Sequence, residues 1–395
     1  MTAIVSNPAG VNLLPTVRFR TPRCRVYDGR MLQRLTDQKT MHVLVATPGT
    51  DQGGIDRVMA SLREQLERDA APGFEVEFAA TRGPSHIALS PLYLGAFLAR
   101  VAALKATGKL DVVHINLASI GSTYRKLIIA RWCRALGVPY VIHLHGADYR
   151  EYWQEQVSPW LAKRIHSMFA HAARIIVLGR VWAEFIALQA PEARDRIVVL
   201  ANASARPTLP QRGGGDRVHI LFLGRLGERK GVPQLTDALK RVQGLPDWRA
   251  TIAGDGEVEA SRAKVAEYGL SDRIDMPGWV GPEGVAELIA SADILVLPSF
   301  SENLPVSVIE GMAAGLAVVA TPVGAVEDIM ENERTGLLVP PGDVDALTHA
   351  LTRVVTDPAL RARLGAEAQQ FHRRVLDLVP YAQATRSLWR DAAQH

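Results

Sequence analysis

Short apolar runs separated by longer amphipathic stretches are the main pattern of this chain. A run of four to seven apolar residues between helical stretches is typical of a strand buried on both faces of a parallel sheet. Alternation of such strands with helices predicts a doubly wound α/β domain, in which ligands bind at the carboxyl ends of the strands. In the first half the runs lie at 42–46, 74–80, 111–115, 140–144, 174–178 and 197–200.

The same pattern restarts in the second half, with apolar runs at 218–223, 249–253 and 294–297. Between the halves, the Pro, Gly and polar residues of 202–217 form the one stretch suited to a linker. We therefore predict two Rossmann-like domains that face each other across a cleft. The predicted order is a basic extension at 1–40, a first domain at 41–201, the linker, a second domain at 218–378 and a final helix at 379–395.

The residues after the run at 294–297 are expected to bind an anion. Ser301 and Asn303 are helix-capping residue types, and Pro305 suits a first helical turn. Backbone amides at the start of that helix should therefore be unpaired and attract an anion.

Two carboxylates and two cations accompany this helix start. Glu302 and Glu310 lie eight residues apart, an offset of roughly 80° at about 100° per helical residue, so both carboxylates can face one side. Arg225 and Lys230 follow the run at 218–223 and reach the same place if the two strands are neighbours. A guanidinium and an ammonium beside a helix start can neutralise a diphosphate. Taken alone, they are equally well explained as exposed bases.

The loops of the first half also contain candidate binding residues. Gly53 and Gly54 stand between a strand and a predicted helix, which is the geometry of a phosphate site, although glycines also serve tight turns. His114 and His145 stand at strand ends. A lone histidine is more often structural than functional. His145 is the stronger functional candidate because it stands at a strand end and is followed by Gly146.

Arg125 and Lys126 stand near another predicted helix start, where they hold an acceptor phosphate or are simply solvated. Asp343 and Asp345 resemble a metal-binding pair, but their position at the opening of a helix predicts a cap instead. No required metal is predicted.

Charge is unevenly distributed along the chain. Residues 1–200 contain 25 Lys and Arg against 16 Asp and Glu, whereas residues 201–395 contain 20 against 25. The excess in the first half is either solvated surface charge or an attraction for anionic lipid or a phosphate-bearing acceptor. Nucleic acid is not expected as a partner, since no basic and aromatic interleaving is present.

Composition indicates a soluble cytoplasmic protein. The 395 residues are 48% hydrophobic and 22% charged, which is ordinary for a globular chain of two domains. The apolar stretch at 311–326 is interrupted by Gly and Pro and is too short to span a bilayer. We also expect no signal peptide, no disulfide framework from the two cysteines, and a reducing compartment.

From about Met41 to the end, the chain resembles the retaining glycosyltransferases of family 4, which have the two-domain GT-B fold and use a nucleotide-diphosphate sugar. The resemblance is specific because several motifs occur in the family's order and spacing. They are Gly224-Arg225-Leu226 with Lys230-Gly231, Gly254-Asp255-Gly256, and the paired glutamates Glu302 and Glu310. Gly53, Gly54 and His145 of the first half agree with it.

The resemblance implies a role for each matching residue. Arg225 and Lys230 bind the diphosphate, while Glu302 and His145 bond the transferred sugar. Glu310 accepts hydrogen bonds from the ribose. Main-chain groups bind the rest of the donor, at Gly254, Trp279, Val280, Asn303 and Leu304.

The function implied is transfer of a sugar, with retained anomeric configuration, from a UDP- or GDP-sugar without a further cofactor. The acceptor is a glycan or a polyprenyl-diphosphate-linked saccharide in polysaccharide or cell-envelope synthesis. The basic first half then faces the inner membrane from the cytoplasm, and the final helix crosses back onto the first domain with Trp389 as an anchor. The alternatives are a sugar-nucleotide epimerase or phosphorylase of the same fold, and a non-catalytic sugar-nucleotide-binding subunit.

Overall fold

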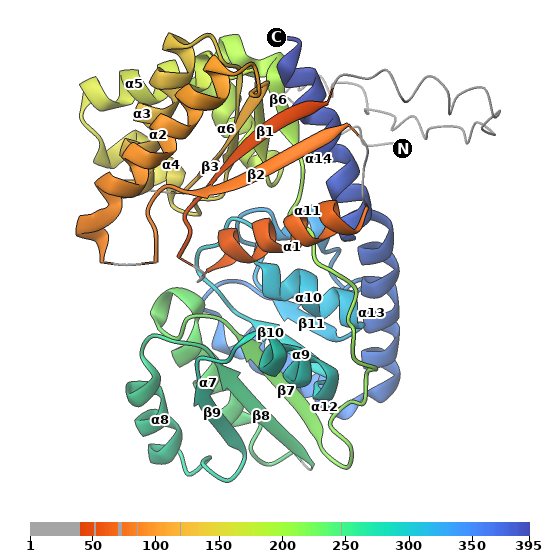
Figure 1. Cartoon of the computed structure of the whole chain (residues 1–395). Coiled ribbons are helices and arrows are strands. Elements are labelled where there is room, and N and C mark those ends of the chain that lie inside the picture. Colours follow the sequence, from red (N-terminus) through yellow and green to blue (C-terminus); the bar gives the residue numbers. More distant parts are fainter. Residues whose placement is uncertain (1–39, 51–52, 70–72, 85, 119, 246) are drawn as a thin grey trace, which may run out of the picture. The chain divides into compact units, whose positions relative to one another are not determined.

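The computed structural model describes residues 40–395, apart from 51–52, 70–72, 85, 119 and 246. The predicted basic extension therefore lies almost entirely outside the described residues. The described residues form two six-stranded sheets, and every strand pair is parallel (Figure 1). The predicted fold class is confirmed.

The first sheet has the strand order β2-β1-β3-β4-β5-β6. Its strands are β1 (Met41–Thr47), β2 (Phe74–Ala80), β3 (Val112–Leu117), β4 (Tyr140–Leu144), β5 (Arg174–Val177) and β6 (Ile197–Val199). The helices between them are α1 (Gly54–Arg68), η1 (Ile87–Leu89), α2 (Ser90–Ala106), α3 (Gly121–Ala135), α4 (Tyr149–Glu151), η2 (Tyr152–Gln156), α5 (Pro159–Ala170), α6 (Arg180–Gln189) and η3 (Pro191–Arg196).

The second sheet has the order β12-β11-β10-β7-β8-β9. Its strands are β7 (Val218–Leu223), β8 (Trp248–Ala253), β9 (Ile274–Gly278), β10 (Ile294–Leu297), β11 (Ala317–Ala320) and β12 (Leu337–Leu338). The helices are η4 (Glu228–Lys230), α7 (Val232–Arg241), α8 (Val258–Glu267), α9 (Pro282–Ser291), α10 (Val306–Ala314), α11 (Val326–Ile329), α12 (Val344–Thr356), α13 (Pro358–Phe371), η5 (His372–Leu376) and α14 (Leu378–Ala393).

Every apolar run identified in the sequence became a strand, but three strands were not predicted. β9 contains Asp275 and Pro277, and its side chains alternate between exposed and buried, because it is an edge strand. β11 continues an apolar stretch that begins in α10, with Gly315 as the main break. β12 has two residues, too few for a periodic signal.

Alternate residues of each central strand pack on opposite faces of the first sheet. Leu44 and Ala46 of β1 point into the core formed with α2, α3 and α5. Val43 and Val45 point to the other face, where they pack with α1 and α14. This is the two-residue period of a strand buried on both sides. Helices α2 and α3 therefore cover the face opposite to α1 and α14.

Helix α14, the blue C-terminal helix in Figure 1, contacts α1 and strands β3, β4 and β5 of the first sheet. Its Trp389 is fully buried, and the indole Nε1 donates a hydrogen bond to His114 Nδ1 at 2.9 Å. Arg386 also pairs with Asp69 at 2.9 Å. The last helix of the chain thus completes the core of the first sheet.

The stretch predicted as a linker runs from the first sheet to the second. Ser204 forms a bridge with Asp377, and Arg206 Nε bonds Asp377 Oδ2 at 2.5 Å. The backbone amides of Arg212 and Gly213 donate to Ala290 O. The domain boundaries themselves stay a prediction.

Truncation of the buried tryptophan tests the role of α14. We expect Trp389→Ala to lower the free energy of unfolding by about 3–5 kcal/mol, the usual cost of removing a buried aromatic side chain. Trp160→Ala is the matched control, because that ring is 62% exposed, and its effect should stay within about 0.5 kcal/mol. Urea unfolding of both variants measures the difference. Equal losses would contradict an anchoring role for Trp389.

Candidate functional site

Several predicted site residues lie at the carboxyl edge of the second sheet. Strand β7 pairs directly with β10, so the loop that contains Arg225 and Lys230 lies beside the loop that contains Glu302. The prediction required these two strands to be neighbours, and they are. The backbone also joins the two loops, since Phe300 N donates to Arg229 O at 2.9 Å.

Lys230 and Glu302 form an ion pair at this edge. The Lys230 ammonium bonds Glu302 Oε1, and the two side chains are 14% and 9% exposed. Ser299 Oγ donates to the same oxygen at 2.8 Å. A largely buried ion pair offsets its loss of hydration only when further hydrogen bonds support it, and Ser299 provides such support. Arg225 is not part of this group: its side chain is 68% exposed and pairs with Asp255 at 3.2 Å.

The residues predicted to cap α10 have a different role. The helix begins at Val306, Pro305 is its N-cap, and no side chain caps it. Ser301 Oγ instead bonds Asp148 Oδ1 at 2.8 Å, and Asn303 Nδ2 donates to Leu144 O at 3.2 Å. The capping prediction is wrong because these side chains bind the first sheet's loops. The helix start keeps amides with no side-chain acceptor, which favours an anion.

A second contact between the two sheets was not predicted. Asn202 Nδ2 donates to Leu304 O at 3.2 Å, and both residues are buried. Asn303 O accepts a hydrogen bond from Ala325 N at 2.7 Å. The loop before α10 is therefore bonded from both sides. The sequence around Asn202 does not predict this contact, because the partner is a backbone carbonyl 102 residues away.

His145 is held in one tautomer by Asn116. Asn116 Nδ2 donates to the carbonyl of Ala46 at 3.3 Å, so the side-chain oxygen Oδ1 faces His145 Nε2 at 2.9 Å. That oxygen is only an acceptor, hence Nε2 carries the hydrogen and Nδ1 keeps its lone pair. Burial lowers the pKa of His145 to about 3, so the ring is neutral at physiological pH. His145 therefore presents an acceptor nitrogen.

His114 and His143 form a buried chain behind it. Trp389 donates to His114 Nδ1, so the neutral His114 ring carries its hydrogen on Nε2, which lies 3.3 Å from His143 Nδ1. The rings of His143 and His145 lie 4.0 Å apart. Burial lowers the pKa of His114 to about 4 and that of His143 well below its ordinary value. His114 thus lies in the core and is not brought to the other predicted residues.

Glu310 and the glycine loop meet near α10. Glu310 Oε1 pairs with Arg57 of α1 at 2.6 Å, while Oε2 is buried and has no hydrogen-bond partner among the described residues. Burial raises the pKa of Glu310, and the charge of Arg57 opposes that shift. A side chain on Gly54 would lie 3.8 Å from Val306. Gly53 has φ of +98° and open space around its Cα, a backbone conformation that favours glycine.

The first sheet's two adjacent cations are less accessible than the sequence indicated. Lys126 is 1% exposed, and its ammonium donates to Thr81 Oγ1 at 2.6 Å. Burial lowers the pKa of Lys126 to about 7, with a contribution from the charge of Arg125. Arg125 is partly buried, and its Nε has no partner among the described residues. Neither side chain is simply solvated.

The remaining predicted residues lie at the ends of β8 and β9. Gly254 has φ of +153°, and a Cβ there would lie 1.8 Å from Gly224 O, so only glycine fits. Its amide donates to Gly278 O at 2.8 Å. Trp279, 63% exposed, and Val280 follow β9 at the same edge. The cap predicted at Asp343 is confirmed, since Oδ1 accepts from Ala346 N at 2.8 Å.

Comparison with known proteins identifies the class. Residues 24–203 match the model of the glycosyl transferase 4-like domain, and residues 211–371 match that of glycosyl transferases group 1. A phosphatidyl-myo-inositol mannosyltransferase of Mycobacterium leprae is 32% identical over 277 residues, which cover 66% of this chain and 69% of that protein. A 2-deoxystreptamine N-acetyl-D-glucosaminyltransferase of Streptomyces fradiae is 28% identical over 83% of this chain and 81% of its own length.

Among solved structures, Anabaena Alr3699/HepE in complex with UDP and glucose superposes with a TM-score of 0.69 at 18% identity, over 88% of this chain and 98% of its own. Two Rossmann-like parallel sheets joined in this way form the GT-B fold. The chain belongs to the glycosyl transferases group 1 family, and it is a glycosyltransferase of glycan biosynthesis.

The buried histidines His114 and His143 should make stability depend on pH. Above about pH 6.5, their ordinary pKa, they are neutral in both the folded and the unfolded chain. As the pH falls from about 6.5 to about 4, the unfolded chain binds protons that the core does not accept, so the free energy of unfolding decreases. Each of these histidines contributes about 1.4 kcal/mol per pH unit to that slope.

Urea unfolding between pH 7.5 and pH 4.5 measures this slope. His143→Gln retains an acceptor for His114 and should reduce the slope by about 1.4 kcal/mol per pH unit. An unchanged slope would show that His143 takes up a proton in the folded state.

Proposed function

We propose that this enzyme transfers a sugar from a nucleotide-diphosphate donor to a saccharide or lipid-linked acceptor, with retention of anomeric configuration, in polysaccharide or cell-envelope glycan synthesis. The observation that carries the proposal is the Lys230–Glu302 pair beside the uncapped start of α10. It combines a cation and amides suited to phosphate with a carboxylate suited to sugar hydroxyls. Family membership supports this function over the non-catalytic alternative.

In the proposed reaction the bond between the sugar's anomeric carbon and the diphosphate oxygen breaks. The acceptor oxygen bonds the same face of that carbon, and its proton passes to the departing phosphate. Charge accumulates on the diphosphate, where Lys230, Arg225 and the free amides of α10 stabilise it. Arg225 is exposed, and its ion pair among the described residues is with exposed Asp255, so it can turn to the donor. No protein nucleophile is assigned.

The transferred sugar is bound by groups from both sheets. Glu302 accepts hydrogen bonds from sugar hydroxyls, and the amides of Asn303 and Leu304 donate to the sugar and the phosphate. His145 contributes Nδ1 as an acceptor for one more hydroxyl, since its Nε2 is engaged by Asn116. A neutral histidine keeps this acceptor over the whole physiological pH range.

The nucleoside end of the donor is assigned to the other predicted residues. Glu310 Oε2, buried and unpartnered within the part of the chain that the structure describes, is suited to the ribose hydroxyls. A Cβ on Gly54 would lie 3.8 Å from Val306 at the start of α10, and a Cβ on Gly53 would meet nothing within 4 Å, so this loop leaves space for the donor. The backbone at Gly254, Trp279 and Val280 holds the base. The HepE structure contains UDP, so UDP-sugars are the first donors to test, followed by GDP-sugars.

On the acceptor side the proposal includes a peripheral location on the cytoplasmic face of the inner membrane. The basic first half of the chain supports it through attraction to anionic lipid. Arg125, whose Nε has no partner in the described ranges, is the better candidate for an acceptor phosphate than the buried Lys126. The proposal requires no metal, because cations and amides of the chain perform the charge stabilisation.

Removal of Lys230 tests the diphosphate role. We expect Lys230→Ala to lower kcat by about 10²–10³-fold, the usual effect of losing one group that stabilises developing charge. The free energy of unfolding should fall by about 1–3 kcal/mol, because Glu302 keeps its bond from Ser299. Arg229→Ala is the control, since among the described residues the Arg229 side chain bonds the Ser301 carbonyl and no carboxylate. Full activity of Lys230→Ala would remove the proposed role.

Nucleotide binding can be tested before the acceptor is known, by thermal shift of the purified protein with nucleotide sugars and free nucleotides. A ligand at about 100 times its Kd stabilises the folded state by about 2.7 kcal/mol. We expect the shift with one nucleotide family and its loss in Glu310→Ala, but not in the exposed control Glu64→Ala. An equal shift in both variants would contradict the ribose contact. Product analysis then separates transfer from epimerisation.

A further inference from the structure

Arg57 was not among the predicted site residues, yet it contacts one of them. Its guanidinium extends from α1, the helix that follows the glycine loop, and bonds Glu310 Oε1 of α10 at 2.6 Å. The two side chains are 44% and 17% exposed, so the carboxylate is the more buried partner. The pair therefore joins a helix of the first sheet to the carboxylate that we assign to the donor ribose.

Apolar packing holds α1 and α10 together beside this ion pair. Val58, next to Arg57 in the chain, is buried in a cluster that includes residues of β1, α1 and α14. Val306, the first residue of α10, packs against that same cluster. About one helical turn separates Val306 from Glu310, and Figure 1 shows α1 and α10 as neighbours. The ion pair therefore lies at the edge of an apolar contact between the two helices.

The start of α1 is fixed by the loop that precedes it. Asp56 accepts hydrogen bonds from the backbone amides of Gly49 and Thr50 at 3.2 and 3.0 Å, and from Thr50 Oγ1 at 2.6 Å. The backbone amide of Arg57 donates to Gly53 O at 3.2 Å. Because Asp56 and Arg57 are adjacent, the backbone from which the guanidinium extends is held in place.

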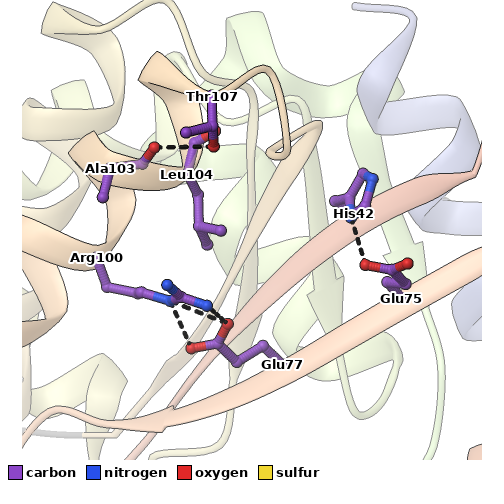
Figure 2. Close-up of polar contacts among 7 residues, drawn as sticks. All are labelled: His42, Glu75, Glu77, Arg100, Ala103, Leu104 and Thr107. Atoms are coloured by element: carbon purple, nitrogen blue, oxygen red, sulfur yellow. Dashed lines mark hydrogen bonds and ion pairs between the residues drawn. The ribbon is translucent and has the colours of Figure 1, made fainter.

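The hydrogen bonding of Glu310 differs from that of the carboxylates in two other arginine pairs. In the exposed pair of Arg100 and Glu77, shown in Figure 2, both carboxylate oxygens accept from the guanidinium. Asp328 also accepts at both oxygens, from Arg180 N and Nε at 2.6 Å each. Glu310 uses Oε1, while its buried Oε2 has no hydrogen-bond partner among the described residues. Buried acceptors are normally satisfied, so Oε2 is available to a ligand hydroxyl.

Arg57 also affects the charge of Glu310. Burial raises the pKa of Glu310 above its ordinary value, and Arg57 supplies the charge that opposes this shift. An oxygen of an ionised carboxylate accepts hydrogen bonds from two donors, so Oε2 can serve two adjacent ribose hydroxyls. Protonation of the carboxylate would convert one acceptor into a donor. Arg57 thus favours the form of Glu310 that suits a ribose.

We propose that Arg57 is a positioning residue for the donor: it fixes the Glu310 carboxylate in the orientation that leaves Oε2 for the ribose hydroxyls. The inference rests on the proposed function, because it takes the contact between Glu310 and the ribose from there. Arg57 belongs to a helix of the first sheet and Glu310 to a helix of the second. Affinity for the nucleoside end of the donor therefore depends on an ion pair that joins the two sheets' helices.

Nucleoside binding by the full chain tests the proposal without an acceptor. Isothermal titration calorimetry measures the Kd of uridine and of UDP, or of guanosine and GDP if the thermal-shift panel selects that base. We expect Arg57→Ala to weaken the nucleoside and the nucleotide by the same factor, about tenfold, the order of one charge-assisted hydrogen bond. Arg57→Lys should recover part of the loss, because an ammonium can still donate to Oε1.

Arg180→Ala is the matched control. It removes another ion pair between helices of the two sheets, with the same 2.6 Å distance and a carboxylate that is 18% exposed. Because Asp328 has no assigned part in donor binding, this variant should leave the Kd of both ligands unchanged. Cooperative thermal unfolding of each variant shows that it is folded.

Two further measurements show whether Arg57 acts through Glu310. In a Glu310→Gln background, Arg57→Ala should change the Kd of uridine little further, because the carboxylate that it positions is gone. From about pH 8 to about pH 6, the uridine affinity of Arg57→Ala should fall more steeply than that of the wild type, since nothing then opposes the raised pKa of Glu310. Uridine is used here because its own charge does not change over this range.

Three results would overturn the positioning role. Tighter uridine binding by Arg57→Ala would show that Arg57 competes with the ribose for Glu310. Weaker UDP binding with unchanged uridine binding would show that Arg57 contacts the diphosphate instead. Equal losses in Arg57→Ala and Arg180→Ala would assign the effect to the contact between the two sheets in general. Failure of the proposed function is seen separately, because the wild type then binds no nucleoside or nucleotide.

Discussion

Parallel pairing of the strands in both described sheets is the constraint on which the arrangement of residues 40–395 depends. When strands run parallel, each loop that follows a strand emerges at the same edge. In the second sheet this brings the loops after β7, β8, β9 and β10 together. In the first sheet it does the same for the glycine loop after β1 and for His145 after β4. Hydrogen bonds from Asn202 and Asn303 then join the two edges.

Burial determines the chemical state of the groups at these edges. His114 and His143, behind the site, are neutral because the core does not solvate an imidazolium. Lys230 and Glu302 stay together because each compensates the other's lost hydration, with Ser299 as a third partner. The tautomer of His114 depends on Trp389 near the end of the chain. Helix α14 covers one face of the first sheet, and its Trp389 donates a hydrogen bond to His114.

Much of the fold was predictable because its signals are local. Apolar runs of strand length stand out against amphipathic stretches, and all the predicted strands are present. β9 and β12 were not predicted, because an edge strand with Pro277 and a strand of two residues have no clear hydrophobic period. The cap at Asp343 was correct, since capping involves residues three apart. The caps at Ser301 and Asn303 were wrong, since distant partners compete for those side chains.

The sequence by itself determined the fold class, the family and the set of candidate residues, because periodicity and short motifs are written in consecutive positions. Only the tertiary structure decided which candidates meet. It paired Lys230 with Glu302 and left Arg225 apart, and it placed His114 and Lys126 inside the core. It also selected the His145 tautomer through Asn116. Exposure, hydrogen-bond partners and pKa arise from neighbours distant in the chain, and no local pattern encodes them.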